Sequence, residues 1–378
     1  MNNQSLYPKG FRSLSVPTFR ASTIPFDDYA SYRDRGSQPR SGYSYGLAGT
    51  PTTRVLQDRI TELEGASETF LVGSGLSAIT TTFLAICRAG DCIALPDNVY
   101  PPVRRFATET LSRLAVETVY YDPEDPADQL DRLERARLLW SESPGSMTHE
   151  VVDFKALRRH ADRLGAILGA DNSWASPILC RPIEHGVEIV VEALSKHLSG
   201  HSDLLMGSIS TSNEKLAGTV YEGGMRTLGV GVSPDDCFLA LRGLETASLR
   251  IRQCGANALK MSEYLSSHEA IDELLYPAAP SSAAHSLYRS QFRGPGSVMT
   301  IVLSGSRTWD FDAMVSSLQN FVLGASWGGT HSILAPSILG TERTVNRSYC
   351  GKTLVRLGIG LEDPGDLKMD LEQFLGTR

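Results

Sequence analysis

Short apolar segments alternate with helical segments over the first half of the chain, and this alternation limits the fold more than any other feature. The apolar segments have the length and composition of buried strands. Between them, apolar residues recur at helical spacing, as in Leu56, Ile60 and Leu63 after the helix start Thr50-Pro51. Strands that alternate with helices form a doubly wound, mostly parallel sheet, so we predict an α/β fold. The predicted strands are Phe70–Val72, Ile93–Leu95, Val116–Tyr120, Arg137–Trp140, Gly165–Asp171 and Val187–Val191.

The alternation weakens after Asp203, which indicates a second, smaller unit. Ser233-Pro234 has the pattern of a helix start and leads into a long helix through Ser266. Val298–Leu303 and Leu354–Ile359 read as strands of a smaller C-terminal α/β domain. We expect an N-terminal arm at 1–48, a large sheet domain at 49–238 and the C-terminal domain at 239–378.

The composition excludes several classes of protein. The formal net charge is −7 and the chain has no basic block, so nucleic acid is not an expected partner. No apolar run has the length of a signal peptide or a membrane span. The 6 cysteines form no C-x-x-C pair, which is typical of reduced thiols, and we expect a cytoplasmic protein. The doublets Arg104-Arg105 and Arg158-Arg159 read as solvated helix faces.

A lysine and an aspartate follow neighbouring strands of the predicted sheet. Lys196 lies just past Val187–Val191, at the strand end where open α/β sheets place ligands. Burial there would lower the lysine pKa and make the amine a nucleophile and a base, although a surface lysine is the simpler interpretation of this segment alone. Asp171 ends the preceding strand and should meet Lys196 at the same sheet edge. A lysine that forms a Schiff base and a carboxylate that holds a pyridine nitrogen are the groups that pyridoxal phosphate (PLP) needs.

A glycine-rich turn, Gly73-Ser74-Gly75, joins the first predicted strand to a helix. Free N–H groups and the positive end of the helix dipole make such a turn an anion site. Considered alone, this sequence could form a tight turn with no ligand. Upstream of Lys196 and Asp171, phosphate binding is the better interpretation, with Gly75 and Leu76 as donors of main-chain N–H groups.

Three motifs give the chain a family resemblance. Glu142–Ser146, Asp171–Pro177 and Ser195–Asp203 resemble, in this order, the Cys/Met-metabolism family of PLP enzymes, which includes the cystathionine lyases and synthases. Ser143–Ser146 and Ser326–Gly329 resemble the cystathionine β-lyase branch. The resemblance implies PLP-dependent transferase fold type I, a PLP cofactor, an amino-acid substrate, and a homotetramer in which the N-terminal arm contacts a neighbouring subunit.

The resemblance also implies roles for individual residues. Arg356 matches the arginine that binds the substrate α-carboxylate. It lies opposite Val355, Leu357 and Ile359 on its strand, although the residue pattern alone would equally suit a surface salt bridge. The implied catalytic residues are Lys196, Tyr100 and Tyr45; the cofactor-binding residues are Lys196, Asp171, Gly75, Leu76, Tyr100, Ser195 and Tyr45; and the substrate-binding residues are Arg356, Ser326 and Trp327. His197 and His201 have the spacing of a metal pair, but Gly200 and the resemblance favour a structural loop, so we predict no metal site.

The chain departs from the β-lyase pattern after Tyr45-Gly46. Leu47 and Ala48 stand where that branch has two arginines, the first of which reaches the cofactor phosphate across a subunit interface. Glu245 replaces a further arginine. These losses make cystathionine, which carries a distal carboxylate, a doubtful substrate. Ser195, Tyr45 and Arg40 are the candidates to replace the phosphate contact.

The sequence thus predicts a PLP-dependent carbon–sulfur β-lyase. It would cleave cystathionine or a related cysteine S-conjugate to a thiol, pyruvate and ammonia. The alternatives are a PLP-dependent γ-elimination or a β- or γ-replacement in a biosynthetic pathway. A PLP-binding protein that acts mainly through partners is a further alternative, which rapid turnover of a thioether amino acid would exclude.

Overall fold

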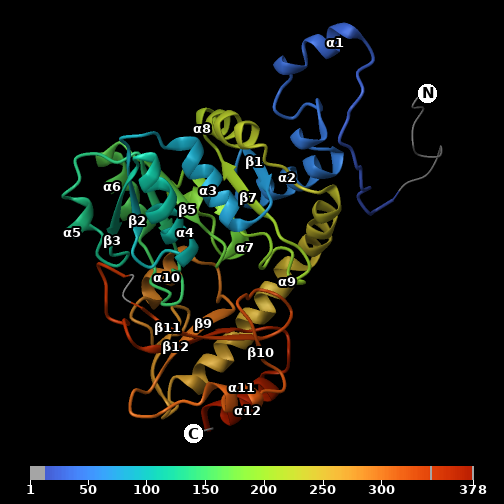
Figure 1. Cartoon of the computed structure of the whole chain (residues 1–378). Coiled ribbons are helices and arrows are strands. Elements are labelled where there is room, and N and C mark those ends of the chain that lie inside the picture. The colour runs from blue at the N-terminus through green and yellow to red at the C-terminus, as the bar shows by residue number, and fades with distance from the viewer. Residues whose placement is uncertain (1–12, 341–342, 377–378) are drawn as a thin grey trace.

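Two sheets, joined by a long helix, organise the molecule (Figure 1). The computed structural model describes residues 13–340 and 343–376. Helix α9 (Pro234–Leu265) begins at the predicted cap Ser233, whose side chain accepts the Asp235 N–H, and runs from the larger unit to the smaller one. The predicted boundary between residues 238 and 239 lies inside this continuous helix, and the division into domains stays a prediction. Among the described residues, no helix is both long and apolar enough to cross a membrane.

The large sheet has seven strands in the order β1-β7-β6-β5-β4-β2-β3. Strands β2 to β6 are mutually parallel, whereas β7 runs antiparallel between β1 and β6. The mostly parallel, doubly wound sheet is therefore confirmed. The bounds are β1 (Glu68–Val72), β2 (Cys92–Pro96), β3 (Glu117–Tyr121), β4 (Leu138–Glu142), β5 (Ile167–Asp171), β6 (Ile189–Glu192) and β7 (Gly207–Thr211).

Alternate residues of these strands point into two separate hydrophobic cores, one on each face of the sheet. Helices α3 and α4 cover one face, and α2, α6 and part of α9 cover the other. Gly65 ends α2 with φ +68°, as predicted for a glycine that closes a helix. The helices of the first two thirds of the chain are α1 (Tyr29–Arg33), α2 (Pro51–Glu64), α3 (Gly75–Ile86), α4 (Pro101–Phe106), α5 (Ala127–Leu130), α6 (Phe154–Leu164), α7 (Ser176–Leu179) and α8 (Glu214–Thr219).

The smaller sheet has five strands in the order β10-β11-β12-β9-β8. All its pairs are antiparallel except β10 with β11. Its strands are β8 (Ile271–Leu275), β9 (Val298–Leu303), β10 (Val322–Leu323), β11 (Ile333–Ile338) and β12 (Thr353–Gly358), and α10 (His285–Gln291), α11 (Phe311–Ser316) and α12 (Pro364–Gly376) belong to the same region.

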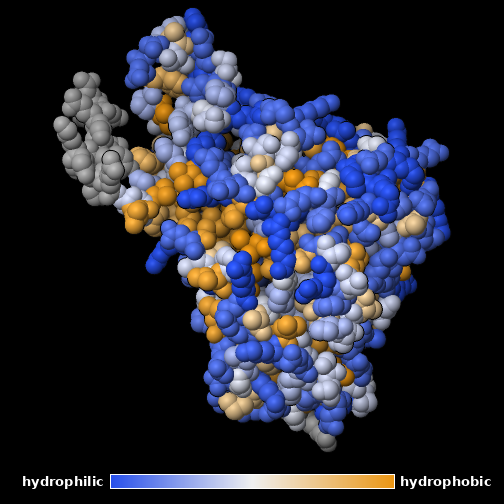
Figure 2. Space-filling view, turned by 180° about the vertical axis from the view of Figure 1, so that it is seen from behind, coloured by the Kyte–Doolittle hydropathy of each residue, from blue (hydrophilic) through white to orange (hydrophobic). Residues whose placement is uncertain are grey.

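The described part of the N-terminal arm extends away from the two sheets (Figure 1). It leaves large hydrophobic side chains exposed, among them Tyr29, Tyr45 and Leu47. Figure 2 shows a hydrophobic area at the base of the arm on the opposite side of the molecule. This area has no covering segment within the described chain.

Candidate active site

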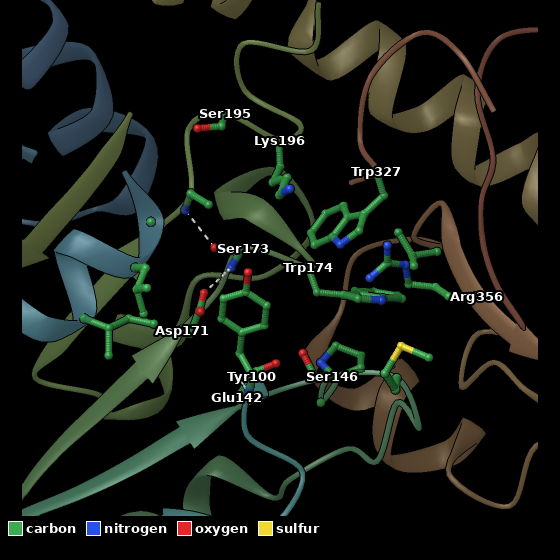
Figure 3. Close-up of a pocket in the computed structure, with 18 of the residues that line it drawn as sticks. Tyr100, Glu142, Ser146, Asp171, Ser173, Trp174, Ser195, Lys196, Trp327 and Arg356 are labelled. Atoms are coloured by element: carbon green, nitrogen blue, oxygen red, sulfur yellow. Dashed lines mark hydrogen bonds between the residues drawn. The ribbon is translucent and has the colours of Figure 1, made fainter. Parts of the chain in front are cut away.

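A cavity of about 220 Å³ lies where β4, β5 and β6 end, between the large unit and the C-terminal strands (Figure 3). This position agrees with the general placement of ligands at the carboxyl ends of parallel strands. The cavity brings together most of the residues that the sequence singles out: Gly75, Leu76, Tyr100, Asp171, Ser195, Lys196, Trp327 and Arg356.

Lys196 lies in the turn that follows β6, with its amine inside the cavity. Its Nζ donates a hydrogen bond to Ser326 Oγ at 2.6 Å and lies 5.4 Å from the centre of the Trp327 ring. Burial, reinforced by the nearby Arg356 cation and opposed by the Asp171 carboxylate, lowers the pKa of Lys196 to about 8. A useful fraction of the amine is therefore neutral near physiological pH, as a nucleophile or base requires.

Two carboxyl groups lie side by side at the floor of the cavity. Asp171 and Glu142 are register partners at the ends of β5 and β4. Asp171 Oδ1 accepts the Ser173 N–H at 2.9 Å, and Glu142 Oε2 accepts the Tyr100 N–H at 2.7 Å. Burial raises the pKa of Asp171, and burial together with Asp171 raises the pKa of Glu142 to about 8. A cation placed against Asp171 would lower its pKa again and keep it ionised.

The start of α3 forms one wall of the cavity. The Ser74 side chain caps the helix by accepting the Ser77 N–H at 3.0 Å, while the first amides of any helix lack partners within it. A Cβ added to Gly75 would lie 2.5 Å from the Ala193 Cβ, so the close approach of the two loops requires glycine here. Ser195 lines the cavity, but its hydroxyl donates to the Met206 carbonyl and accepts the Met206 N–H.

Arg356 approaches from β12, on the side of the cavity opposite Asp171 (Figure 3). Its Nη2 donates to the Ser326 carbonyl at 3.3 Å, and burial lowers its pKa. No ion pair among the described residues includes Arg356, so the surface-salt-bridge alternative does not hold in this part of the chain. A half-buried guanidinium without an ion pair in this part of the chain is well suited to bind a carboxylate with two hydrogen bonds.

Tyr45 does not join this group within its own chain. It is about half exposed and lines a second hollow beside the arm, together with Leu47 and Ala48. Arg40 is held by Glu68 and Glu214 and is not free for a phosphate of its own chain. Glu245 is exposed on α9.

The two histidines of the Lys196 loop face separate backbone groups. His197 Nε2 lies 3.1 Å from the Trp174 carbonyl oxygen. His201 Nδ1 lies 2.6 Å from the Ser199 carbonyl oxygen.

Several residues that line the cavity were not among the predicted site residues. Trp174 and His149 line it, and Ser173 accepts the Ala193 N–H at 2.7 Å while its own N–H binds Asp171. Glu142 and Trp174 lie inside the motifs Glu142–Ser146 and Asp171–Pro177, so the family resemblance could have indicated both of them as site residues. His149 lies five residues after Pro144, outside every motif used.

The arrangement fits PLP on the chemistry of its groups. Lys196 supplies a half-buried amine of lowered pKa, Asp171 a half-buried carboxyl of raised pKa, and the start of α3 main-chain donors for a phosphate. Tyr100 adds an aromatic ring to the same cavity. A mostly parallel sheet with these groups at its carboxyl edge defines a fold type I PLP-dependent enzyme.

The comparisons with known proteins identify the family. The model of the Cys/Met metabolism PLP-dependent enzymes matches residues 2–376, and the chain belongs to this family. It is 34% identical over 373 residues to the cystathionine beta-lyase of Bordetella avium, covering 97% of this chain and 93% of the relative. It is also 34% identical over 376 residues to the L-alanine/L-glutamate racemase of Wolbachia pipientis wMel, covering 96% of this chain and 92% of the relative.

A solved structure gives the same result for the fold. The cystathionine gamma synthase from Xanthomonas oryzae pv. oryzae, in complex with cystathionine, superposes with a TM-score of 0.88 at 27% identity, covering 98% of this chain and 94% of the other. The predictions of a PLP-dependent enzyme, of fold type I and of a cystathionine β-lyase-like family member are therefore confirmed.

Proposed function

We propose that the protein is a carbon–sulfur β-lyase that converts a cysteine S-conjugate to a thiol, pyruvate and ammonia. One observation carries the proposal: Ser326 contacts both Lys196 Nζ, through its hydroxyl, and Arg356 Nη2, through its carbonyl. An amino acid whose carboxylate binds Arg356 would therefore present its Cα next to the Lys196 amine. The recurrence of the β-lyase name among relatives supports the same reaction.

Each step can be assigned to residues of this chain. Arg356 would bind the substrate carboxylate with two parallel N–H donors. When bound, PLP supplies an electron sink for the negative charge that forms at Cα. Asp171 would hold the protonated ring nitrogen, and Tyr100 would face the ring. Lys196 would accept the Cα proton; the Cβ–S bond then breaks, the thiolate leaves and takes up a proton, and the released enamine reacts with water to give pyruvate and ammonia.

The lining of the cavity favours substrates with an uncharged distal group. Its only cationic side chains among the described residues are Lys196 and Arg356, and both have roles at the reacting end. The remaining wall includes the apolar side chains Leu76, Ile79, Met147, Leu205 and Val298. A second carboxylate, as in cystathionine, would find no further cation among the described residues that line the cavity, and Leu47 and Ala48 replace the arginines of the β-lyase pattern.

The predicted homotetramer and cytoplasmic location stay part of this proposal; the extended arm and the hydrophobic area at its base support association of several copies of the chain. Tyr45 and Leu47 of the arm are exposed. In such an assembly Tyr45 would reach the cavity of a neighbouring subunit. Light scattering of the purified protein should give four times the mass of one chain, and a monomer would contradict the proposal.

A panel of thioether amino acids tests the reaction. Purified holoenzyme is incubated with cystathionine, small neutral cysteine S-conjugates and methionine, and pyruvate, 2-oxobutyrate and thiol are assayed separately. Pyruvate with an equal amount of thiol supports β-elimination. The second candidate is γ-elimination, since solved structures named as a γ-synthase and a γ-lyase superpose on nearly the whole chain; it would yield 2-oxobutyrate instead. Change of configuration without either keto acid would point to racemisation and contradict the lyase proposal.

A further inference from the structure

The connection between β11 and β12 is far longer than its two antiparallel strands require. Such neighbours are commonly joined by two to five residues, whereas this connection runs from residue 339 to 352. In Figure 1 it leaves the small sheet and reaches the large unit near the ends of β2 and β3. We call residues 343–346, its part in contact with the large unit, the strap.

Asp97, the first residue after β2, binds the strap through a set of short contacts. Its carboxylate accepts the consecutive main-chain N–H groups of residues 344, 345 and 346, each at 3.0 Å. It also accepts Arg104 Nη2 at 2.7 Å. The Asp97 side chain is fully buried, and these donors lower its pKa despite the burial, so it is ionised. Arg104 stacks on the Tyr120 ring and is itself buried, so the prediction that it lies on a solvated helix face is wrong.

A second buried ion pair lies next to the first. Arg343 of the strap donates to Glu150 at 2.9 Å and also reaches Thr148 and the Ser146 carbonyl. Glu150 in turn accepts Asn98 Nδ2 at 2.8 Å, which joins the loop of residues 97–100 to the loop of residues 143–150. Two cations and two anions therefore share one buried network, and removal of one partner would leave an unpaired buried charge.

The anchored loops carry the walls of the cavity. Asp97 and Arg104 bracket Tyr100 in the sequence, and Ser146 and Met147 line the cavity from the second loop. Six residues, 347–352, join the strap to β12, which carries Arg356. The same few residues thus connect the ring expected to face the cofactor with the guanidinium expected to bind the substrate.

We propose that Asp97 and Arg343 are positioning residues that fix the spacing between Tyr100 and Arg356. The strap holds β12, and with it Arg356, at a fixed position relative to the large unit. The cofactor and the substrate carboxylate would then lie at a fixed distance from each other. This inference rests on the proposed roles of Tyr100 and Arg356, and it extends them to side chains that do not touch the substrate. A misplacement of about 1 Å in such a site can cost on the order of 100-fold in rate.

The chain offers a matched control for Asp97. Asp370 on α12 is also buried and also accepts three consecutive main-chain N–H groups, those of residues 319–321, at 2.7–2.8 Å. It does not line the cavity. Asp97→Asn and Asp370→Asn therefore both remove a buried charge that accepts three main-chain N–H groups, one beside the site and one away from it, and Asp97→Asn in addition leaves Arg104 without its anion.

The test measures the melting temperature, the Kd of PLP by absorbance titration of apoprotein, and KM and kcat of the holoenzyme. We expect both variants to lose stability, but only Asp97→Asn to weaken PLP binding and to raise KM, with kcat/KM reduced roughly 10- to 100-fold. Equal changes in the two variants, or none in Asp97→Asn, would overturn the proposal.

A second variant and the choice of measurement make the test decisive. If Asp97→Asn does not fold, Arg343→Lys, which keeps the charge and loses the paired donors, should show the same pattern more weakly, and an unchanged Kd of PLP in it would refute the proposal. The PLP titration does not depend on which reaction is catalysed. Failure of the β-lyase proposal would therefore appear in the products, and failure of the positioning proposal in the binding constants.

Discussion

Replacement of Arg356 gives the strongest test of the site. Its guanidinium has one long hydrogen bond, to the Ser326 carbonyl, and no ion pair within the described chain, so four of its five N–H groups remain and two of them can bind a carboxylate. Each hydrogen bond to a charged group contributes about 1.5–3 kcal/mol. Arg356→Gln should therefore cost about 3–6 kcal/mol, which corresponds to roughly 10²- to 10⁴-fold in kcat/KM. Arg356→Lys keeps the charge but loses the fork, and should cost roughly 10- to 150-fold.

The same variants test the electrostatics of the cavity. The Arg356 cation helps to lower the pKa of Lys196 to about 8, so its removal should raise that pKa, whereas Arg356→Lys should leave it nearly unchanged. Only the neutral amine attacks PLP, so the rate of PLP attachment to apoprotein should rise with pH through about 8 in the wild type and at higher pH in Arg356→Gln. Arg105→Gln, an exposed substitution on α4, is the control. A loss below fivefold in kcat/KM, with an unshifted pH profile, would refute both assignments.

Four further outcomes follow from the structure. Lys196→Ala should abolish the yellow colour and the borohydride-stable PLP adduct on the peptide that contains residue 196. Mass spectrometry of the borohydride-treated protein checks this, and an adduct on another lysine would contradict the assignment. Asp171→Ala should lower kcat far more than Tyr100→Phe does; normal turnover would contradict the role of the carboxylate. Leu47→Arg should tighten PLP binding roughly 10- to 150-fold by restoring a charged hydrogen bond, as measured by titration of apoprotein. Glu64 is fully buried, neither of its oxygens has a hydrogen-bond partner in the described chain, and burial raises its pKa to about 8. The folded state therefore holds a proton that the unfolded chain releases above about pH 4.5, so stability should fall as pH rises from about 4.5 to about 8 and then level off. Glu64→Gln should flatten this fall, measured as Tm between about pH 5 and pH 8.

The sequence could predict the central site because its residues follow strands with clear apolar patterns. Asp171 ends one buried strand, Lys196 follows the next, and parallel strands end at a common edge. Arg356 required the family resemblance as well, since its strand belongs to another sheet and its pattern suited a surface arginine equally.

Other parts of the fold carry no such pattern. Strand β7 was not predicted because its buried positions 208 and 210 are serines and only Ile209 is apolar. Arg104 was assigned to a solvated face because its partner Asp97 lies in a preceding loop whose shape a helical pattern does not define. The strap contacts join residues about 200–250 positions apart in the sequence. Many of them use main-chain N–H donors, which every residue type except proline has, so the side-chain pattern does not predict them.

The antiparallel placement of β7 has a consequence for biosynthesis. Strand β1, which leads into the glycine turn of the site, pairs in the large sheet with β7 alone. Thr211, the register partner of Glu68, is therefore made long after Glu68. At 5–20 residues per second, roughly 7–28 s of translation separate the two strands. During that time an apolar strand lacks its neighbour and resembles an exposed edge, the kind of surface that recruits other chains. This exposure ends only after Lys196 and β7, the strand that follows it, have been made.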